Sequence, residues 1–356
     1  MITFDLTRFL IDTLMISCIY VVLSVSLNLE YGYAGIPNIG KVLFFASGSF
    51  MVAALSIRLS TYLLGLSYTN YSVESRILVT KINEVLAKDP ILSISLFVML
   101  TAIAVASSVA MAFALSYPTA RLRETYLGVT LLVAGEILRY IGRYNEKFIG
   151  GTLGSPVIDV FNWVGIGLVR DIFVLIVYLG IAISCWILVT KMLRSPYGRL
   201  LKAIRDDEEA SMSLGKNVNK IRVYVLVAGS ALAGLAGAMY AFYVGYIDSG
   251  DFTPDKTFLV FLMIIIGGKA NPYGPLIGSI FYVIIERTIR QVKYFFKAPF
   301  DINYLAILLL GLVLIMFMLF KPTGLLHERN DLENLHKKLK NPEKSFKENQ
   351  HENHHN

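Results

Sequence analysis

Residues 31–41 read YGYAGIPNIGK, and residues 267–278 read GGKANPYGPLIG. Both stretches interrupt long apolar segments with glycine and proline, which leave backbone N–H and C=O groups that lipid cannot satisfy. Such interruptions persist in a membrane only where protein buries them or a watery cavity wets them. The two stretches therefore predict a helical membrane protein in which some helices are broken.

Apolar runs of membrane-spanning length surround the two breaks. Of the 356 residues, 55% are hydrophobic and 17% are charged, whereas a soluble domain has about 25% charged residues. A span needs about 20 apolar residues to cross a hydrocarbon core of about 30 Å. We predict an all-α polytopic helix bundle of about 8–10 transmembrane segments, some of them broken, with an internal repeat. The strongest spans are 9–29, 43–66, 91–115, 125–141, 171–193, 222–244 and 303–320.

Paired breaks near the two ends of the chain are typical of transporters built from repeats, in which interrupted helices mark the transport path. Glu136 and Arg139 stand three residues apart in an apolar run, so they either pair with each other or line that path. Glu30 and Lys41 bracket the first break, and we expect them at the membrane interface. The candidate path residues are Gly32, Gly35, Pro37, Asn38, Glu136, Arg139, Gly267, Gly268, Pro272, Gly274 and Pro275.

The positive charges predict which loops face the cytoplasm. Segment 191–222 has eight lysines and arginines against four acids, whereas segment 67–90 is neutral. By the positive-inside rule, 191–222 lies in the cytoplasm, and segments 67–90 and 142–170 lie outside. We divide the chain into a transmembrane domain, 1–320, which includes a cytoplasmic loop at 194–221, and a polar cytoplasmic tail, 321–356, that reads as disordered.

The cytoplasmic loop predicts a short helix. Ala203 to Leu214 contains good helix formers, Gly215 suits the C-terminal end, and Arg205 and Glu209 are spaced to pair on one face. A helix of about 12 residues is marginally stable alone in water, so a partner surface would stabilise it. The alternative is a solvated loop that only connects two spans.

Residues for catalysis or metal binding are missing from the apolar body of the sequence. All five histidines lie at or beyond His327, and the two cysteines lie inside apolar runs. Gly35 to Lys41 matches a phosphate-binding pattern, but Val42 follows in place of serine or threonine, and no strand precedes it. We expect no catalytic residue, no metal, no cofactor and no nucleic-acid partner. If the protein uses ATP, the ATPase is another chain.

Several stretches in a fixed order resemble the LivM-like permease subunits of ABC importers for branched-chain amino acids. They cover roughly residues 20–325 and comprise Leu27–Leu29 with Gly32–Gly35, Gly135–Arg139, Gly198–Gly215, Gly234–Ala241 and Gly267–Gly278. The chain departs from the family pattern at three places. Ile36–Lys41 stands where the family has a Gln-Leu-Ser-like stretch and usually a histidine, Gly150–Ser155 lacks the usual Asn-Gly, and Lys269 stands in a normally apolar turn.

The resemblance implies a multi-pass subunit of the plasma membrane that is not itself an enzyme. It would pair with a homologous permease subunit, two cytoplasmic ABC ATPases and an extracellular substrate-binding protein, within membrane lipid. The helix from Arg205 to Leu214 would be the coupling helix, and its candidate contact residues are Arg205, Asp206, Glu208, Glu209, Ala210 and Gly215. Two alternatives stay open: an ABC permease for urea, short amides or a sugar, and a secondary transporter driven by an ion gradient.

Overall fold

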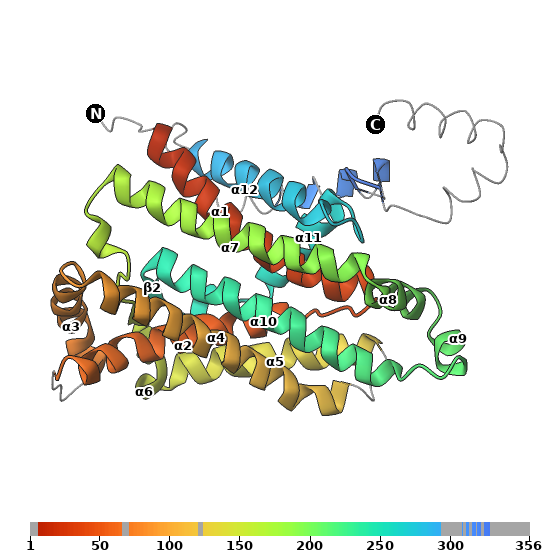
Figure 1. Ribbon diagram of the computed structural model, residues 1–356, viewed down its shortest axis with the longest axis horizontal. Coiled ribbons are helices and arrows are strands. Elements are labelled where there is room, and N and C mark those ends of the chain that lie inside the picture. The colour runs from red at the N-terminus through yellow and green to blue at the C-terminus, as the bar shows by residue number, and fades with distance from the viewer. Residues whose placement is uncertain are drawn as a thin grey trace, which may run out of the picture.

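A computed structural model describes residues 6–65, 71–119, 124–292, 308, 311–312, 315–317, 319–321 and 324–327. Within these residues the fold is all-α apart from one two-residue strand pair, as predicted. Long helices run side by side along a common axis (Figure 1). They are α1 (Leu6–Leu27), α2 (Lys41–Leu63), α4 (Pro90–Thr119), α5 (Glu124–Tyr144), α7 (Leu168–Arg194), α10 (Val218–Val244), α11 (Asp255–Gly267) and α12 (Gly274–Val292).

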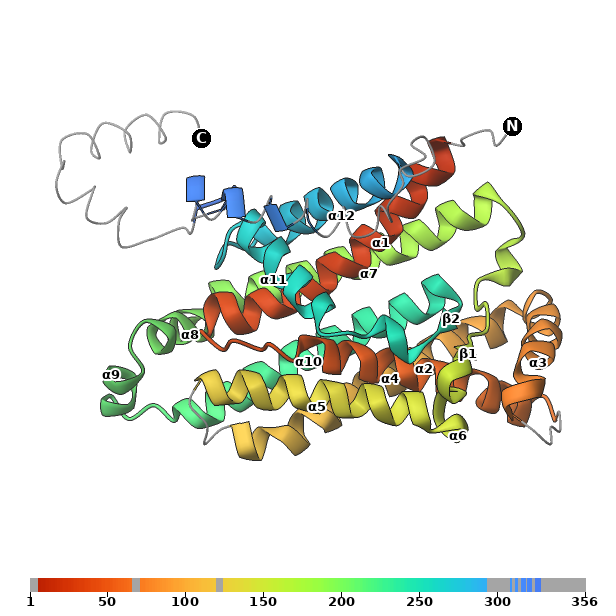
Figure 2. The same cartoon turned by 180° about the vertical axis from the view of Figure 1, so that it is seen from behind.

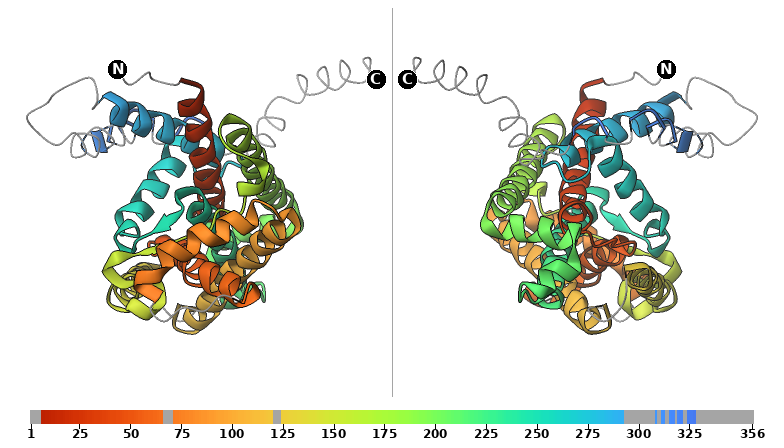
Figure 3. Two further views of the ribbon diagram at one scale, coloured as in Figure 1. Left: turned by 90° about the vertical axis from the view of Figure 1, so that its left-hand side faces the viewer. Right: turned by 90° about the vertical axis from the view of Figure 1, so that its right-hand side faces the viewer.

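Short elements close the two ends of the bundle. At one end, called the α3 end below, lie α3 (Tyr71–Leu86), α6 (Glu146–Ile149) and the antiparallel pair of β1 (Ser155–Pro156) with β2 (Tyr246–Ile247). At the other, the α8 end, lie α8 (Pro196–Asp206) and α9 (Glu208–Ser213). Figure 2 shows the same two ends from behind, and Figure 3 looks along the bundle from each of them. The remaining short helices are η1 (Asn28–Tyr33, a π-helix), η2 (Gly151–Leu153), η3 (Asn162–Val164) and η4 (Ser249–Asp251).

Five of the described helices are long and apolar enough to cross a membrane: Leu6–Tyr33, Lys41–Leu63, Pro90–Ser116, Leu168–Arg194 and Val218–Val244. They are not equally buried. In the Lys41–Leu63 span 78% of the most apolar window is buried, against 28% in Pro90–Ser116 and in Leu168–Arg194. Helices α4 and α7 therefore present apolar surface that lipid or another subunit can cover. Most of the predicted span 303–320, and the tail beyond residue 327, lie outside the described residues.

The centre of the bundle depends on small residues where α2, α4 and α10 meet. A Cβ atom at Gly237 would lie 2.2 Å from the carbonyl oxygen of Phe45, and one at Gly48 would lie 2.2 Å from that of Gly234. The Ser49 hydroxyl donates to the Gly237 carbonyl over 2.7 Å, and the Ser108 hydroxyl donates to the Phe44 carbonyl over 2.9 Å. Glycine lets the helix backbones approach this closely, and serine hydroxyls then join them across the apolar interface.

The first turns of α2 and α11 meet inside the bundle. Each helix follows a long helix and a connection that contains no α-helix, residues 34–40 in one case and 245–254 in the other. The Val42 N–H donates to the Thr257 hydroxyl oxygen over 3.1 Å. The sequence pattern predicts a correspondence between the breaks at 31–41 and 267–278. The structure adds a second correspondence, because the connection at 245–254 precedes α11 as the connection at 34–40 precedes α2.

Candidate functional site

A buried ion pair holds the first break together. The Lys41 ammonium lies 2.9 Å from Glu30 Oε1, the Asn38 amide donates to Glu30 Oε2 over 2.9 Å, and all three side chains are fully buried. We expected Glu30 and Lys41 at the membrane interface, and the structure encloses both side chains within the protein, away from solvent. A lone buried charge would be costly, so each residue requires the other. Gly229 of α10 leaves room for the carboxylate, because a Cβ there would lie 2.0 Å from Glu30 Oε1.

The position of Lys41 gives this pair a further role. Lys41 is the first residue of α2, where the positive end of the helix dipole disfavours a cation. Glu30, which lies in η1, compensates for that repulsion. The predicted path residue Asn38 belongs to this cluster, and its Oδ1 atom has no hydrogen-bond partner among the described residues. Pro37 lies next to it in the connection before α2.

Side chains from η1 and α7 satisfy the backbone of the second break. The Asn28 amide donates to the Asn271 carbonyl over 3.0 Å and accepts from the Ala270 N–H over 3.1 Å. The Trp186 indole donates to the Pro272 carbonyl over 2.7 Å. These bonds replace the helical ones that the break removes, which is the condition for irregular backbone at membrane depth.

A segment near the end of the described chain closes the same break. The Leu325 N–H donates to the Ile266 carbonyl over 2.8 Å, and the Leu326 N–H donates to the Gly267 carbonyl over 3.1 Å. Gly268 has φ +114°, and a Cβ there would lie 2.0 Å from the Leu326 carbonyl oxygen. Only glycine fits that position, for both its conformation and its space.

The structure brings the two predicted breaks together. A Cβ at Gly32 would lie 3.0 Å from the Ala270 nitrogen and 2.2 Å from the Asn28 amide oxygen. Gly267 packs against Gly274, since a Cβ at Gly267 would lie 1.9 Å from the Gly274 carbonyl oxygen. The backbone approaches another residue closely at Gly32, Gly267, Gly268 and Gly274. Pro275 follows in the first turn of α12.

Glu136 and Arg139 pair with each other on α5. Arg139 Nη2 lies 2.5 Å from Glu136 Oε2, and the Arg139 guanidinium also lies over the Tyr140 ring, 4.9 Å from its centroid. The side chains are 24% and 15% exposed. The sequence left two roles open for Glu136 and Arg139, pairing with each other or lining the transport path. The geometry favours pairing.

The loop that we predict to be cytoplasmic contains two short helices, so the prediction of one helix from Ala203 to Leu214 is wrong. Asp207 interrupts it in an extended conformation, with φ −153° and ψ 104°, and its carboxylate accepts from the Ala210 N–H over 2.9 Å. Aspartate is a strong N-terminal cap, so it starts α9 instead of continuing α8. Gly215 ends the loop helix region with φ +76°, in the left-handed conformation that a C-terminal glycine adopts.

The break between α8 and α9 changes the ion pairs of the loop. Arg205 pairs with its neighbour Asp206 over 2.9 Å, not with Glu209 as the single helix predicted. Glu208 pairs with Arg222 of α10 over 2.7 Å. Glu209 is exposed beside it. The pairing of Glu208 with Arg222 ties α9 to the first turns of α10.

Arg205 joins this loop to the first break. Its Nη1 atom donates to the Gly32 carbonyl over 2.9 Å, and a Cβ at Gly35 would lie 3.0 Å from Arg205 Cγ. The Lys202 ammonium lies 5.7 Å from the centroid of the Tyr33 ring. Movement of α8 would therefore act directly on residues 32–35.

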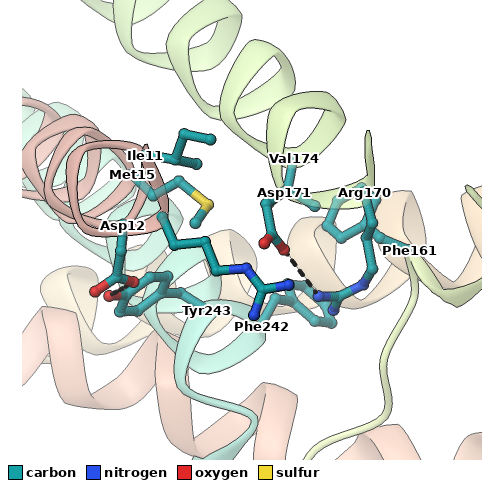
Figure 4. Close-up of a pocket in the computed structure, with 10 residues that line it drawn as sticks. Ile11, Asp12, Met15, Phe161, Arg170, Asp171, Val174, Phe242 and Tyr243 are labelled. Carbon is teal, nitrogen blue, oxygen red and sulfur yellow. Dashed lines mark hydrogen bonds and ion pairs between the residues drawn. The ribbon is translucent and has the colours of Figure 1, made fainter. Parts of the chain in front are cut away.

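A cavity of about 300 Å³ opens at the α3 end, between α1, α7 and α10 (Figure 4). Its apolar wall consists of Ile11, Met15, Phe161, Val174 and Phe242. Its polar residues are Arg8, Asp12, Arg170, Asp171 and Tyr243. The cavity thus combines both signs of charge with an aliphatic and aromatic surface.

The charges of this cavity form a network. Asp12 accepts from Arg287 of α12 over 2.5 Å and from the Tyr243 hydroxyl. Arg170 lies 2.5 Å from Asp159 and 3.6 Å from Asp171, while its buried Nε–H has no partner among the described residues. Sequence reasoning missed this site, since its residues come from separate helices. The available signal was two aspartates, at positions 12 and 171, near the ends of apolar spans.

The helices are broken inside the bundle, side chains form hydrogen bonds with the backbone groups freed at the breaks, and an exposed helical loop contacts the first break. These features are those of a transmembrane transport protein. The chain belongs to the family described as "Branched-chain amino acid transport system / permease component", which it matches over residues 9–318. This match confirms the resemblance and the class of transport permease.

Named relatives support the assignment. The chain is 32% identical over 316 residues to the "Probable branched-chain amino acid transport permease protein LivM" of Methanocaldococcus jannaschii, which covers 87% of this chain and 91% of that protein. It is 25% identical over 348 residues to the "High-affinity branched-chain amino acid transport system permease protein LivM" of Escherichia coli, covering 91% and 71%. A LivH permease of M. jannaschii is 24% identical over 213 residues, covering 57% and 64%. No solved structure matches the chain.

Proposed function

We propose that this chain is the transmembrane subunit of an ABC importer for branched-chain amino acids in the plasma membrane. It pairs with a homologous permease, two cytoplasmic ATPases and an extracellular substrate-binding protein. The names of its relatives support the substrate, and the similarity to both LivM and LivH proteins supports a permease pair.

The observation that carries the mechanism is the hydrogen bond from Arg205 to the Gly32 carbonyl. Helices α8 and α9 lie at one end of the bundle, where an ATPase can contact them (Figure 3). Closure of the ATPases around ATP moves α8, and Arg205 transmits that movement to residues 32–35. The broken segments then exchange between two packings, as in other discrete conformational switches.

The charge distribution supports the orientation. The α8 end carries the basic segment 191–222, so we place it in the cytoplasm. The α3 end is then extracellular, and Arg8 in the first turn of α1 lines the same cavity as Arg170. The cavity of Figure 4 opens on the side from which a binding protein delivers its substrate.

The chemistry of that cavity suits an aliphatic amino acid. A zwitterion presents a carboxylate to arginine and an ammonium to aspartate, and Arg8, Arg170, Asp12 and Asp171 place both kinds of charge on the cavity wall. The apolar wall accepts a branched side chain. We infer that this cavity is the first contact of the released amino acid with the permease.

Reconstitution tests the proposal. The chain is expressed with the genes adjacent to its own, and the purified complex is placed in proteoliposomes with its binding protein. Leucine accumulation that requires internal ATP is the expected result. Accumulation of urea or a sugar without leucine would overturn the substrate. Uptake that continues without ATP and collapses with an ionophore would overturn the ABC mechanism in favour of a secondary transporter.

A further inference from the structure

A second cavity of about 300 Å³ lies at the α8 end, between the last turn of α7, the helix α8 and the break at 270–273. Three cationic side chains line it, Arg194, Arg199 and Lys202. No acidic side chain is among the described residues that line it. This cavity differs in character from the one at the α3 end, which holds acids and bases together.

Two of these cations, Arg194 and Arg199, do not pair with the acids of the neighbouring loop. Asp206 pairs with Arg205, and Glu208 pairs with Arg222. Among the described residues, neither Arg194 nor Arg199 forms an ion pair or a hydrogen bond through its side chain. Arg194 and Arg199 therefore give the cavity positive charge that no acid among the described residues neutralises, which favours an anionic ligand.

The cavity lies at the level of lipid headgroups. Helix α7 has 27 residues, which extend about 40 Å at about 1.5 Å per residue. This length matches a bilayer with its polar headgroup regions, about 40–45 Å. Arg194 is the last residue of α7, so its guanidinium reaches the headgroup region while the helix body lies in hydrocarbon.

An exposed apolar track leads to the cavity. Ile183 and Ile187 are 45% and 39% exposed on α7. They precede Arg194 by eleven and seven residues, so all three lie within about 20° of one helix face at 3.6 residues per turn. The acyl chain of a phospholipid can lie along these isoleucines while the phosphate of its headgroup contacts the arginine. A free anion has no acyl chain and would not contact the isoleucines.

We propose that this cavity binds the phosphate headgroup of an anionic phospholipid. Arg194 and Arg199 contact the phosphate, Lys202 adds positive charge, and the acyl chain follows Ile183 and Ile187. Ala270 to Tyr273 form one wall of the cavity, so the bound headgroup touches the second break. The inference does not depend on which substrate the protein transports.

The test uses the full chain purified in detergent. Native mass spectrometry measures binding of phosphatidylglycerol and of phosphatidylcholine, and thermal unfolding is followed with each lipid and with inorganic phosphate. The wild type should bind phosphatidylglycerol in preference, and only that lipid should raise the unfolding temperature. The double variant R194Q/R199Q should bind it about thirtyfold more weakly, from about fivefold per cation.

The matched control is K191Q/K216Q, which removes the same charge from two exposed lysines that do not line the cavity, one in the last turn of α7 and one in the loop. It should keep the wild-type affinity. Equal weakening in both double variants would show a diffuse charge effect and overturn the site. An equal rise in unfolding temperature with inorganic phosphate would assign the cavity to a free anion and overturn the lipid.

Discussion

Arg205 Nη1 lies 2.9 Å from the carbonyl oxygen of Gly32, although 173 residues separate them in the chain. The same guanidinium pairs with Asp206. One side chain therefore contacts the exposed loop and the broken helix together. A planar group with several fixed donors is required to reach both partners.

Replacing Arg205 should uncouple ATP hydrolysis from transport. Arg205→Ala removes a hydrogen bond between a charged donor and a carbonyl, worth about 1.5–3 kcal/mol. We expect at least tenfold less leucine taken up per ATP hydrolysed in proteoliposomes, and Arg205→Lys should restore only part of it. Lys216→Ala, in the same loop, should leave the ratio unchanged. Wild-type coupling in Arg205→Ala would disprove the link to Gly32.

Single changes in the Glu30–Lys41 pair should destabilise the protein more than the double change. Glu30→Gln and Lys41→Met each leave a buried charge without its partner, which costs about 3–5 kcal/mol. The double variant keeps the shape of both side chains and should recover most of that loss. Thermal unfolding in detergent measures the three variants, and additive losses in the double variant would contradict an ion pair.

Two glycines provide a test of close helix packing. Gly237→Ala places a methyl group 2.2 Å from the Phe45 carbonyl oxygen and should cost about 1–3 kcal/mol. A Cβ at Gly180, on α7, meets nothing within 4 Å. Gly180→Ala should be neutral or stabilise the helix by up to about 1 kcal/mol. Unfolding temperatures that rank the two variants in the opposite order would refute this packing.

Two tryptophans differ in whether the indole N–H forms a hydrogen bond. Trp186→Phe removes the donor to the Pro272 carbonyl, so it should cost about 1–3 kcal/mol by leaving that oxygen unpaired. The buried indole N–H of Trp163 has no partner among the described residues. Trp163→Phe should therefore cost less. Equal losses, measured by unfolding, would mean that ring size matters and the hydrogen bond does not.

The cavity at the α3 end predicts a change in apparent affinity for substrate. Asp171→Asn removes a negative charge that can receive the amino group, and we expect the KM for leucine uptake to rise about tenfold, because a hydrogen bond between charged groups is lost. Asp89→Asn, exposed at the same end of the bundle, is the control. An unchanged KM in Asp171→Asn would remove this cavity from the path without affecting the proposed transport of leucine.

The class of protein followed from the sequence because lipid imposes strong rules on composition. Long apolar runs and two glycine-rich interruptions were sufficient to predict a bundle with broken helices, and the order of the motifs pointed to the family. Helix ends were less predictable. Asp207 is compatible with a helix interior by composition, and only its cap to the Ala210 N–H shows that a second helix starts there.

The cavities and the buried ion pair were beyond sequence reasoning for a different reason. As isolated charges in the sequence, Glu30 and Lys41 suggest a position at the membrane interface. In the structure the connection 34–40 folds back into the bundle, and both side chains are buried. The α3-end cavity depends on Asp12, Arg170 and Tyr243 from three helices. Contacts between such distant positions are set by packing, and local patterns do not encode them. The candidate coupling residues and path residues remain predictions for the experiments above.

The full burial of Glu30 and Lys41 also constrains how the membrane-insertion machinery handles the nascent chain. If the first hydrophobic segment entered the bilayer alone, it would carry an unneutralised carboxylate into hydrocarbon, at a cost of several kcal/mol. The segment that begins at Lys41 would face the same barrier with the opposite charge. The two segments should therefore enter the bilayer together, with Glu30 already paired to Lys41, and biogenesis of this protein should slow down when synthesis pauses between them.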